Sequence, residues 1–275
     1  MSTNSSRWAF NFTKWAPTES QILIATSCVQ NEEKERLAKF VFKKDFKASL
    51  IGRLMMRKYV AETFNVAYKD VIFKRDDRGK PYLDNSIRKY PDLSFNVSHQ
   101  GDYAVFAAEP SRRRLGVDVM KLDYAGGRNL SEFFRIMTRQ FSPNEWKTIK
   151  GCDGEKKQIA MFCRHWALKE SYVKAIGVGI TVNLQDISFK INSMQLFKDL
   201  LVTDTELYLK GVKQDWVFEE MLLDDEHCVA VALEKDVSGG TRVLFEEIDF
   251  NTLMCNCESL LPTDEVYTRN FFIKM

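Results

Sequence analysis

A carboxylate inside an apolar run marks the first place where this chain could do chemistry. Asp118 lies between Val117 and Val119 in a segment, Gly116 to Met120, that should be a mostly buried strand. An ionised carboxylate is costly to bury unless a metal ion or a hydrogen-bonded cation compensates its charge. Taken alone, an aspartate at a strand end facing solvent is the simpler interpretation, so Asp118 needs partners before it indicates a site.

A second pair of charged residues falls on a largely apolar helical segment. Glu170 and Lys174 are four residues apart and therefore share one helix face. On an exposed helix this would be an ordinary ion pair worth about 0.2–0.5 kcal/mol. Apolar residues cover much of the circumference, however, so we expect Glu170 to face a cleft rather than open water. These apolar residues are Met161, Phe162, Trp166, Leu168, Val173 and Ile176.

Two further segments have groups suited to binding an anion. Residues Asn96 to Gln100 bring hydrogen-bonding side chains to the end of a predicted strand, where backbone amides can also face a ligand. The loop Arg75 to Pro81 holds cations around Gly79. A satisfied turn histidine at His99 and a solvated charged loop are the simpler interpretations. The chain has no GxxxxGK[ST] or GxGxxG motif, which disfavours P-loop and dinucleotide-binding folds.

Helices must position part of these groups. The spacing of apolar residues predicts a helix over residues 32–64, with Asn31 as its N-cap and a break near 43–45. A second helix over residues 156–176, which carries Glu170 and Lys174, should end at Gly177.

Strands must position the rest. Strand patterns cover residues 71–74, 94–98, 103–108, 115–119, 187–191, 216–222 and 228–233. The order helix, strand, hairpin occurs twice, which predicts an α+β fold of two similar halves in a pseudo-twofold arrangement with a ligand cleft between them. We expect these halves to cover residues 1–120 and 121–250. A loop at 236–240 and an irregular tail over 251–275 should follow.

The composition limits the classes of protein that the chain can belong to. Forty basic and 38 acidic residues leave a net charge of +2, far from the excess typical of nucleic-acid-binding proteins. No stretch approaches the roughly 20 apolar residues of a membrane span, and the first residues lack the apolar core of a secretory signal. The six cysteines contain no C-x-x-C pair. We therefore expect a cytoplasmic protein with reduced thiols.

Taken in order, these segments resemble the 4′-phosphopantetheinyl transferases. The resemblance is to the large, two-half type, and within it to the animal branch that acts on aminoadipate-semialdehyde dehydrogenase. It runs from Arg7 to Leu233. It rests on GVDVM at 116–120 and WALKESYVKAIGVG at 166–179, supported by FNVSHQGDYAVFAAEP at 95–110. Three motifs in register are much more specific than one.

The resemblance implies an enzyme that moves the 4′-phosphopantetheine arm of coenzyme A to a serine of an apo carrier protein and releases adenosine 3′,5′-bisphosphate. It implies Asp118 and Glu170 as Mg²⁺ ligands and Asp118, Glu170 and Lys174 as catalytic residues. Glu170 is also a candidate base for the acceptor serine, and Lys174 would reach the pyrophosphate. The residues implied to contact coenzyme A are Arg36, Arg75, Asp76, Asp77, Arg78, Gly79, Lys80, Asn96, Val97, Ser98, His99, Asp118, Glu170, Ser171, Tyr172, Val173 and Lys174.

One position departs from the bacterial members of the family. They have an acidic metal ligand two residues after the strand aspartate, where this chain has Met120, as in the animal branch. A thioether is a poor partner for a hard cation. The third metal ligand would therefore be water or Gln100.

Two alternatives stay open. The first is an inactive coenzyme A-binding sensor or scaffold; two carboxylates beside an anionic ligand disfavour it, because they repel the ligand unless a metal bridges them. The second is an RNA-binding module that uses Arg112 to Arg114 with Arg53, Arg57 and Lys58, which the near-neutral charge disfavours.

The resemblance also implies partners. They are the carrier domain of fatty acid synthase, aminoadipate-semialdehyde dehydrogenase and related folate-linked or mitochondrial carriers. Carrier domains are often acidic, so the region of Lys43, Lys44 and Lys47 is a docking candidate. We expect a monomer, because a chain with two halves builds its own cleft.

Overall fold

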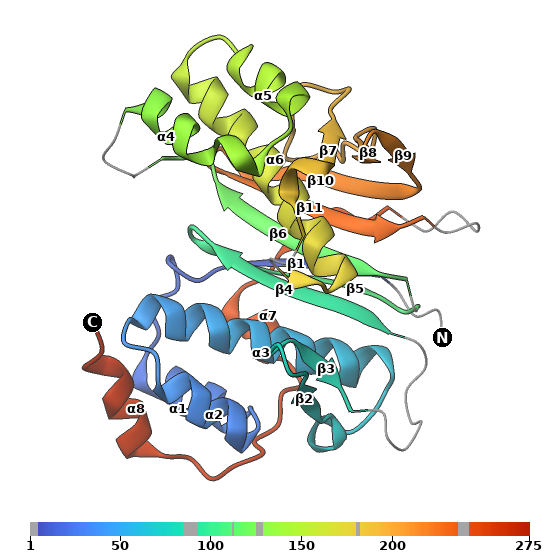
Figure 1. Ribbon diagram of the computed structural model, residues 1–275. Helices are drawn as coiled ribbons and strands as arrows, with labels where there is room; N and C mark the ends of the chain where they lie inside the picture. Colours follow the sequence, from blue (N-terminus) through green and yellow to red (C-terminus); the bar gives the residue numbers. More distant parts are fainter. Residues whose placement is uncertain (1–4, 85–92, 112, 125–128, 180–181, 236–241) are drawn as a thin grey trace.

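Two sheets pack face to face in the centre of the molecule, and helices cover the outer face of each (Figure 1). This computed structural model describes residues 5–84, 93–111, 113–124, 129–179, 182–235 and 242–275. The mixture of long helices and largely antiparallel sheets confirms the predicted α+β class. None of the helices in these ranges is long and apolar enough to cross a lipid bilayer.

The first sheet has the strand order β12-β1-β5-β4. Its strands are β1 (Ser6–Asn11), β4 (Ser94–Gln100), β5 (Tyr103–Glu109) and β12 (Glu246–Glu247). The central strand β5 is buried along its whole length. Because side chains alternate along a strand, Phe106 packs toward helix α3 (Lys43–Thr63) while Val105 packs toward the second sheet.

The second sheet has the order β10-β11-β6 and lies under helix α6. Its strands are β6 (Leu115–Lys121), β10 (Trp216–Asp224) and β11 (His227–Glu234), and α6 covers Glu155–Ile176. In both sheets the strand that precedes the long helix pairs with the second strand of a hairpin, β1 with β5 and β6 with β11. The repeated order of elements predicted from the sequence is therefore present in the strand pairing.

Shorter elements complete the two halves. They are α1 (Glu19–Ser27), α2 (Asn31–Ala38), the 3₁₀ helix η1 (Tyr68–Asp70), β2 (Phe73–Arg75), β3 (Pro81–Leu83), α4 (Leu130–Ile136), η2 (Met137–Gln140), α5 (Pro143–Lys150), η4 (Leu184–Asp186), β7 (Ile187–Lys190), β8 (Glu206–Leu209), β9 (Val212–Gln214), α7 (Phe250–Met254) and α8 (Glu265–Phe272). Strands β2 and β3 form a hairpin, and β7, β8 and β9 form a small sheet of their own.

The first predicted helix is two helices. Its break lies at residues 39–42, before the expected position, because α3 already begins at Lys43. Asn31 is also not the N-cap; Gln30 has that position, and Asn31 is the first residue of α2, where its amide donates to Glu35 at 2.7 Å. The side chain of Gln30 is instead used by tertiary contacts, with its oxygen accepting from the Phe73 backbone at 2.7 Å.

The tail was expected to be irregular, and this expectation is wrong. It contains α7 and α8 after β12, which runs parallel to β1. Buried residues of the tail, among them Leu253 and Phe271, belong to the core that α3 forms with the first sheet. Such short helices have too few turns for a clear apolar period.

The boundaries expected from the sequence have different outcomes. The predicted loop at 236–240 lies outside the described residues. The expected limit at residue 120 falls inside β6, which pairs with the second sheet. The division into 1–120, 121–250 and 251–275 stays a prediction.

Candidate functional site

Side chains of β4 join the two halves at the edge of β6. The Asn96 side-chain oxygen accepts from the Val117 backbone nitrogen at 3.0 Å, and the Gln100 oxygen accepts from the backbone nitrogen of Lys121 at 2.6 Å. Between them, the Ser98 hydroxyl donates to Asp118 at 2.8 Å. Every second residue of β4 thus faces β6, and this alternation positions the carboxylate of Asp118.

Lys174 is the cation that compensates Asp118. Its Nζ lies 2.6 Å from Asp118 Oδ1, 2.7 Å from Ser98 Oγ and 3.3 Å from the carbonyl oxygen of Val117. Asp118 is only 5% exposed, so the sequence argument that its charge needs a partner holds in the structure. This contact links α6 of the second half to β4 of the first.

Glu170 lies one helical turn before Lys174 and is half-buried. Among the residues that the structure describes, none forms a hydrogen bond or an ion pair with its carboxylate. Burial raises the pKa of Glu170, the negative charge of Asp118 raises it further, and Lys174 lowers it in part. Two carboxylates, one from α6 and one from β6, therefore lie close enough to repel each other, and Asp118 is the one in contact with a cation.

Close packing of α6 on β6 sets this geometry. A Cβ at Gly116 would lie 2.5 Å from the backbone nitrogen of Ala175 and closer still to the carbonyl oxygen of Ser171. Only glycine allows the strand and the helix to approach so closely. Asp118 is two residues along the same strand, so the approach brings Glu170 and Lys174 within its reach.

The charged loop after β2 is folded against the end of α6. Asp76 orders it, because its Oδ1 accepts from the backbone nitrogens of Arg78 and Lys80 at 3.0 and 2.8 Å, and Gly79 takes a φ of +80°. Arg78 donates to the carbonyl oxygen of Gly177, and Lys80 Nζ to that of Lys174 at 3.2 Å. Cations suit this position, because the C-terminus of a helix carries a partial negative charge.

An arginine cluster lies beside this loop. Arg75 and Arg53 share the carboxylate of Glu33, with nitrogen–oxygen distances of 2.9 and 3.0 Å. Burial is the main reason why the pKa of Arg53 falls to about 10; Glu33 raises it, whereas Arg75 and then Arg36 lower it. Three guanidinium groups with one carboxylate leave an excess of positive charge next to the pocket described next.

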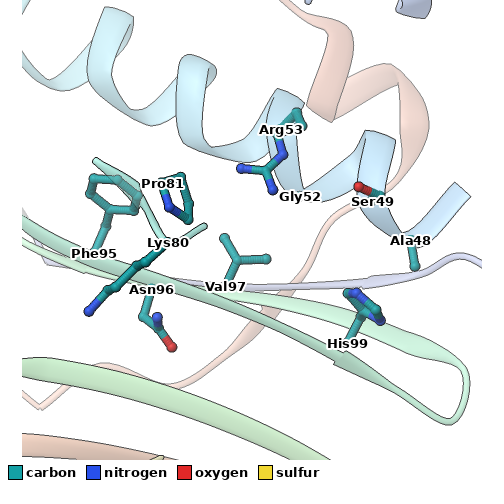
Figure 2. A pocket seen from close by; sticks show the side chains of 10 residues that line it. All are labelled: Ala48, Ser49, Gly52, Arg53, Lys80, Pro81, Phe95, Asn96, Val97 and His99. Atoms are coloured by element: carbon teal, nitrogen blue, oxygen red, sulfur yellow. The ribbon is translucent and has the colours of Figure 1, made fainter. Parts of the chain in front are cut away.

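A pocket opens between α3 and β4, on the opposite side of β4 from Asp118. Figure 2 shows Val97 and His99 pointing into it, whereas Asn96 points away toward β6. Its wall includes Arg53 and Lys80. His99 is an exposed residue, but neighbouring atoms partly desolvate its ring; this desolvation lowers its pKa, and the charge of Lys174 lowers it further. An uncharged imidazole can accept or donate a hydrogen bond here.

The other predicted ligand contacts are placed differently. Arg36 and Asp77 are exposed, while Ser171 is buried and its hydroxyl donates to the carbonyl oxygen of Leu168 at 2.9 Å. Tyr172 and Val173 pack into the core behind α6. Contacts of Ser171, Tyr172 and Val173 to a ligand stay a prediction.

Three residues near the site were not predicted to belong to it: Arg53, Glu33 and Ser49. Arg53 appeared only in the RNA alternative, and Glu33 lies in the first turn of α2, where an acidic residue is common without any role in a site. Ser49 lies on α3, where it lines the pocket. A sequence signal for Arg53 was available. It follows Ser49 by four residues in a predicted helix, so both residues share one helix face, and this face lies toward β4.

The basic residues of the RNA alternative do not form one surface. Arg57 donates to the carbonyl oxygen of Tyr68 and Lys58 to Glu62, both inside the first half. Arg114 forms an ion pair with Glu234, and Arg113 bonds the Glu234 backbone. Arg112 lies outside the described residues.

Asp118 and Glu170 fit a magnesium ion. Mg²⁺ takes oxygen ligands and is usually held by one or two protein carboxylates, with water and substrate phosphates completing its shell. Two carboxylates whose negative charges repel each other meet this requirement. Within the described ranges, no group of three or more His, Cys, Asp or Glu residues is arranged to hold a metal ion. The Gln100 oxygen is held by Lys121, and Met120 packs against apolar residues around α6.

Two models of known families match the chain. The model described as 4′-phosphopantetheinyl transferase, N-terminal, matches residues 13–111. The model described as 4′-phosphopantetheinyl transferase superfamily matches residues 114–232, which include the residues of β6 and α6.

Curated proteins are similar over most of the chain. The L-aminoadipate-semialdehyde dehydrogenase-phosphopantetheinyl transferase of Xenopus laevis is 41% identical over 280 residues, covering 97% of this chain and 91% of that protein. The human protein of the same name is 42% identical over 272 residues, covering 94% and 88%. The 4′-phosphopantetheinyl transferase of Bacillus subtilis is 28% identical over 176 residues, covering 64% and 71%. The chain therefore belongs to the 4′-phosphopantetheinyl transferase superfamily, as its motifs predicted.

Proposed function

We propose that this protein transfers the 4′-phosphopantetheine arm of coenzyme A to a serine of an apo carrier protein in a Mg²⁺-dependent reaction and releases adenosine 3′,5′-bisphosphate. The family supports transferase activity with coenzyme A as the substrate. The observation that carries the proposal is the convergence of Asp118, Glu170 and Lys174 beside Ser98 where the two halves join. Neither the comparisons nor the described residues favour an inactive binding protein.

The arrangement suggests how coenzyme A would lie. The arginine cluster formed by Arg36, Arg53 and Arg75 suits its 3′-phosphate, and the pocket beside His99 suits the adenosine end. The diphosphate would then lie toward Lys80 and Lys174. Ammonium and guanidinium groups bind phosphate oxygens through charge-assisted hydrogen bonds.

The transfer needs one bond to form and one to break. The acceptor serine oxygen attacks the phosphorus on the pantetheine side, and the bond to the adenosine-side oxygen breaks. Glu170 takes the serine proton directly or through one water, which its raised pKa and lack of a partner suit. Lys174 neutralises charge that develops on the diphosphate. A magnesium ion held by Asp118 and Glu170 would add further charge neutralisation and orient the phosphates.

The acceptor, the compartment and the oligomeric state are part of the proposal. An aminoadipate-semialdehyde dehydrogenase is one acceptor, since the names of two relatives include it. Lys44, on the first turn of α3 beside the exposed Val41 and Phe42, could contact an acidic carrier, whereas Lys47 is engaged by the carbonyl oxygen of Trp15. The free cysteines suit the cytoplasm, and a site built from one chain suits a monomer.

The test is the mass of an apo acyl carrier protein after incubation with this protein, coenzyme A and Mg²⁺. We expect a gain of one phosphopantetheine arm, and loss of that gain with EDTA or with Glu170→Gln. No gain with several apo carriers, despite measurable coenzyme A binding, would refute the enzyme and support the sensor.

A further inference from the structure

All three protons of the Lys174 ammonium group are used inside the protein. An ammonium group has three N–H donors. Its three oxygen partners are Asp118 Oδ1, Ser98 Oγ and the carbonyl oxygen of Val117, at 2.6, 2.7 and 3.3 Å. In this arrangement Lys174 has no N–H left for a phosphate, so it must give up at least one partner before it can bind a diphosphate.

The Lys174 ammonium group also lies directly beside Asp118, which is a proposed metal ligand. Nζ is in contact with the Asp118 carboxylate, and Ser98 donates to the same oxygen at 2.8 Å. A divalent cation on Asp118 would stand within a few ångströms of this positive charge and would be repelled by it. Lys174 and the metal therefore compensate the same carboxylate, and each disfavours the other.

The Lys174 side chain has room to move. It is 28% exposed, whereas the Asp118 side chain is 8% exposed. Lysine has four rotatable bonds and holds its partners as a point charge rather than in a fixed fork. The lysine, and not the aspartate, is thus the group that can change position.

We propose that Lys174 is a built-in counter-ion of Asp118 that the metal replaces, and that coenzyme A draws Lys174 onto its diphosphate and so opens Asp118 to the metal. This inference rests on the proposed function. It makes metal and coenzyme A bind with positive coupling, and linkage requires the coupling to be the same in both directions. Ser98 is a positioning residue that holds the lysine and the carboxylate together until then.

The test is direct metal binding to the full chain without coenzyme A, measured from the electron paramagnetic resonance signal of free Mn²⁺. Lys174→Met should lower the Kd for Mn²⁺ by about tenfold or more, within the range typical of coupled sites. Lys80→Met is the matched control, because it removes a neighbouring cation that bonds the Lys174 carbonyl rather than the carboxylate. Its effect should be clearly smaller.

Two results would overturn the inference. In the first, the Lys174→Met protein binds Mn²⁺ no more tightly than the Lys80→Met protein does. In the second, the Lys174→Met protein binds Mn²⁺ more weakly than the wild type, which would mean that the lysine supports the metal site. Lys174→Gln repeats the measurement if the methionine variant does not fold by circular dichroism. Saturating coenzyme A should then tighten Mn²⁺ binding more in the wild type than in either Lys174→Met or Lys174→Gln.

The proposed function is judged separately. If the wild type modifies an apo carrier but the lysine variants bind Mn²⁺ no more tightly than Lys80→Met, only the counter-ion inference fails. If the wild type neither binds coenzyme A nor modifies a carrier, the proposed function fails, whatever the Mn²⁺ affinities are.

Discussion

Replacing Gly116 by alanine tests whether the contact between β6 and α6 sets the site. The added Cβ would lie 2.5 Å from Ala175 N and 3.1 Å from Ala175 Cα. Non-bonded heavy atoms prefer separations of about 3.5 Å or more, so α6 would have to move away from β6 by about 1 Å. The obstacle is backbone, which cannot rotate aside. We expect the upper part of the usual overpacking cost, about 2–3 kcal/mol.

Both stability and rate should respond. A loss of that size should lower the unfolding midpoint by about 4–10 °C in a chain of this length. A shift of about 1 Å between Asp118 and the residues of α6 should slow transfer by about 100-fold. The assays are thermal unfolding and the rate of carrier mass gain at saturating coenzyme A.

The matched control for stability is Gly52→Ala. Its Cβ would meet only Val97 Cγ1, at 2.9 Å, and this methyl group can rotate away. Alanine also favours a helix over glycine by about 1 kcal/mol, which offsets the contact. A Gly116→Ala protein with the stability and transfer rate of the wild type would refute the reasoning.

Three further predictions concern single side chains. Glu170→Gln should abolish transfer, because it removes the proposed base. It should also raise the unfolding midpoint at pH 8, since the raised pKa of Glu170 means that the fold disfavours its ionised form, and this gain should disappear below the ordinary glutamate pKa of 4.5. A lower midpoint at pH 8 would contradict this. Asn96→Ala leaves the buried Val117 nitrogen without its acceptor and should cost about 1–3 kcal/mol in urea unfolding, and an unchanged midpoint would show that water replaces the amide. Arg53→Met should raise the KM for coenzyme A but not for dephospho-coenzyme A, which lacks the 3′-phosphate; equal effects on both substrates would place the phosphate elsewhere.

Local patterns were sufficient for the elements that hold the site. The strands around Gly101 and the helix that ends at Gly177 follow from alternation, apolar spacing and glycine, all of which depend on neighbouring residues. The motif residues Asp118, Glu170 and Lys174 lie on these elements, and the structure brings them together.

Partners that are distant in sequence could not be predicted in the same way. Glu33 matches the preference for acids at a helix N-terminus, but it binds Arg75, 42 residues later. Gln30 is the N-cap without capping the helix, because its side-chain oxygen accepts from Arg57 and from the Phe73 backbone instead. Likewise, the tail forms helices because the core of the first half covers their apolar side chains, a tertiary effect that five to eight residues do not reveal.

The return of the tail to the first half has a consequence for synthesis on the ribosome. Phe271 packs on Phe46 with ring centroids 4.9 Å apart, and Glu246 pairs with Trp8. The first half is complete at Glu109 but cannot close its core until about 160 further residues have been made, which takes about 8–32 s at ordinary elongation rates. During that interval the nascent chain presents the apolar face of α3 to its surroundings. A chaperone that covers this face would therefore matter more for the yield of this protein than for one whose halves are completed in order.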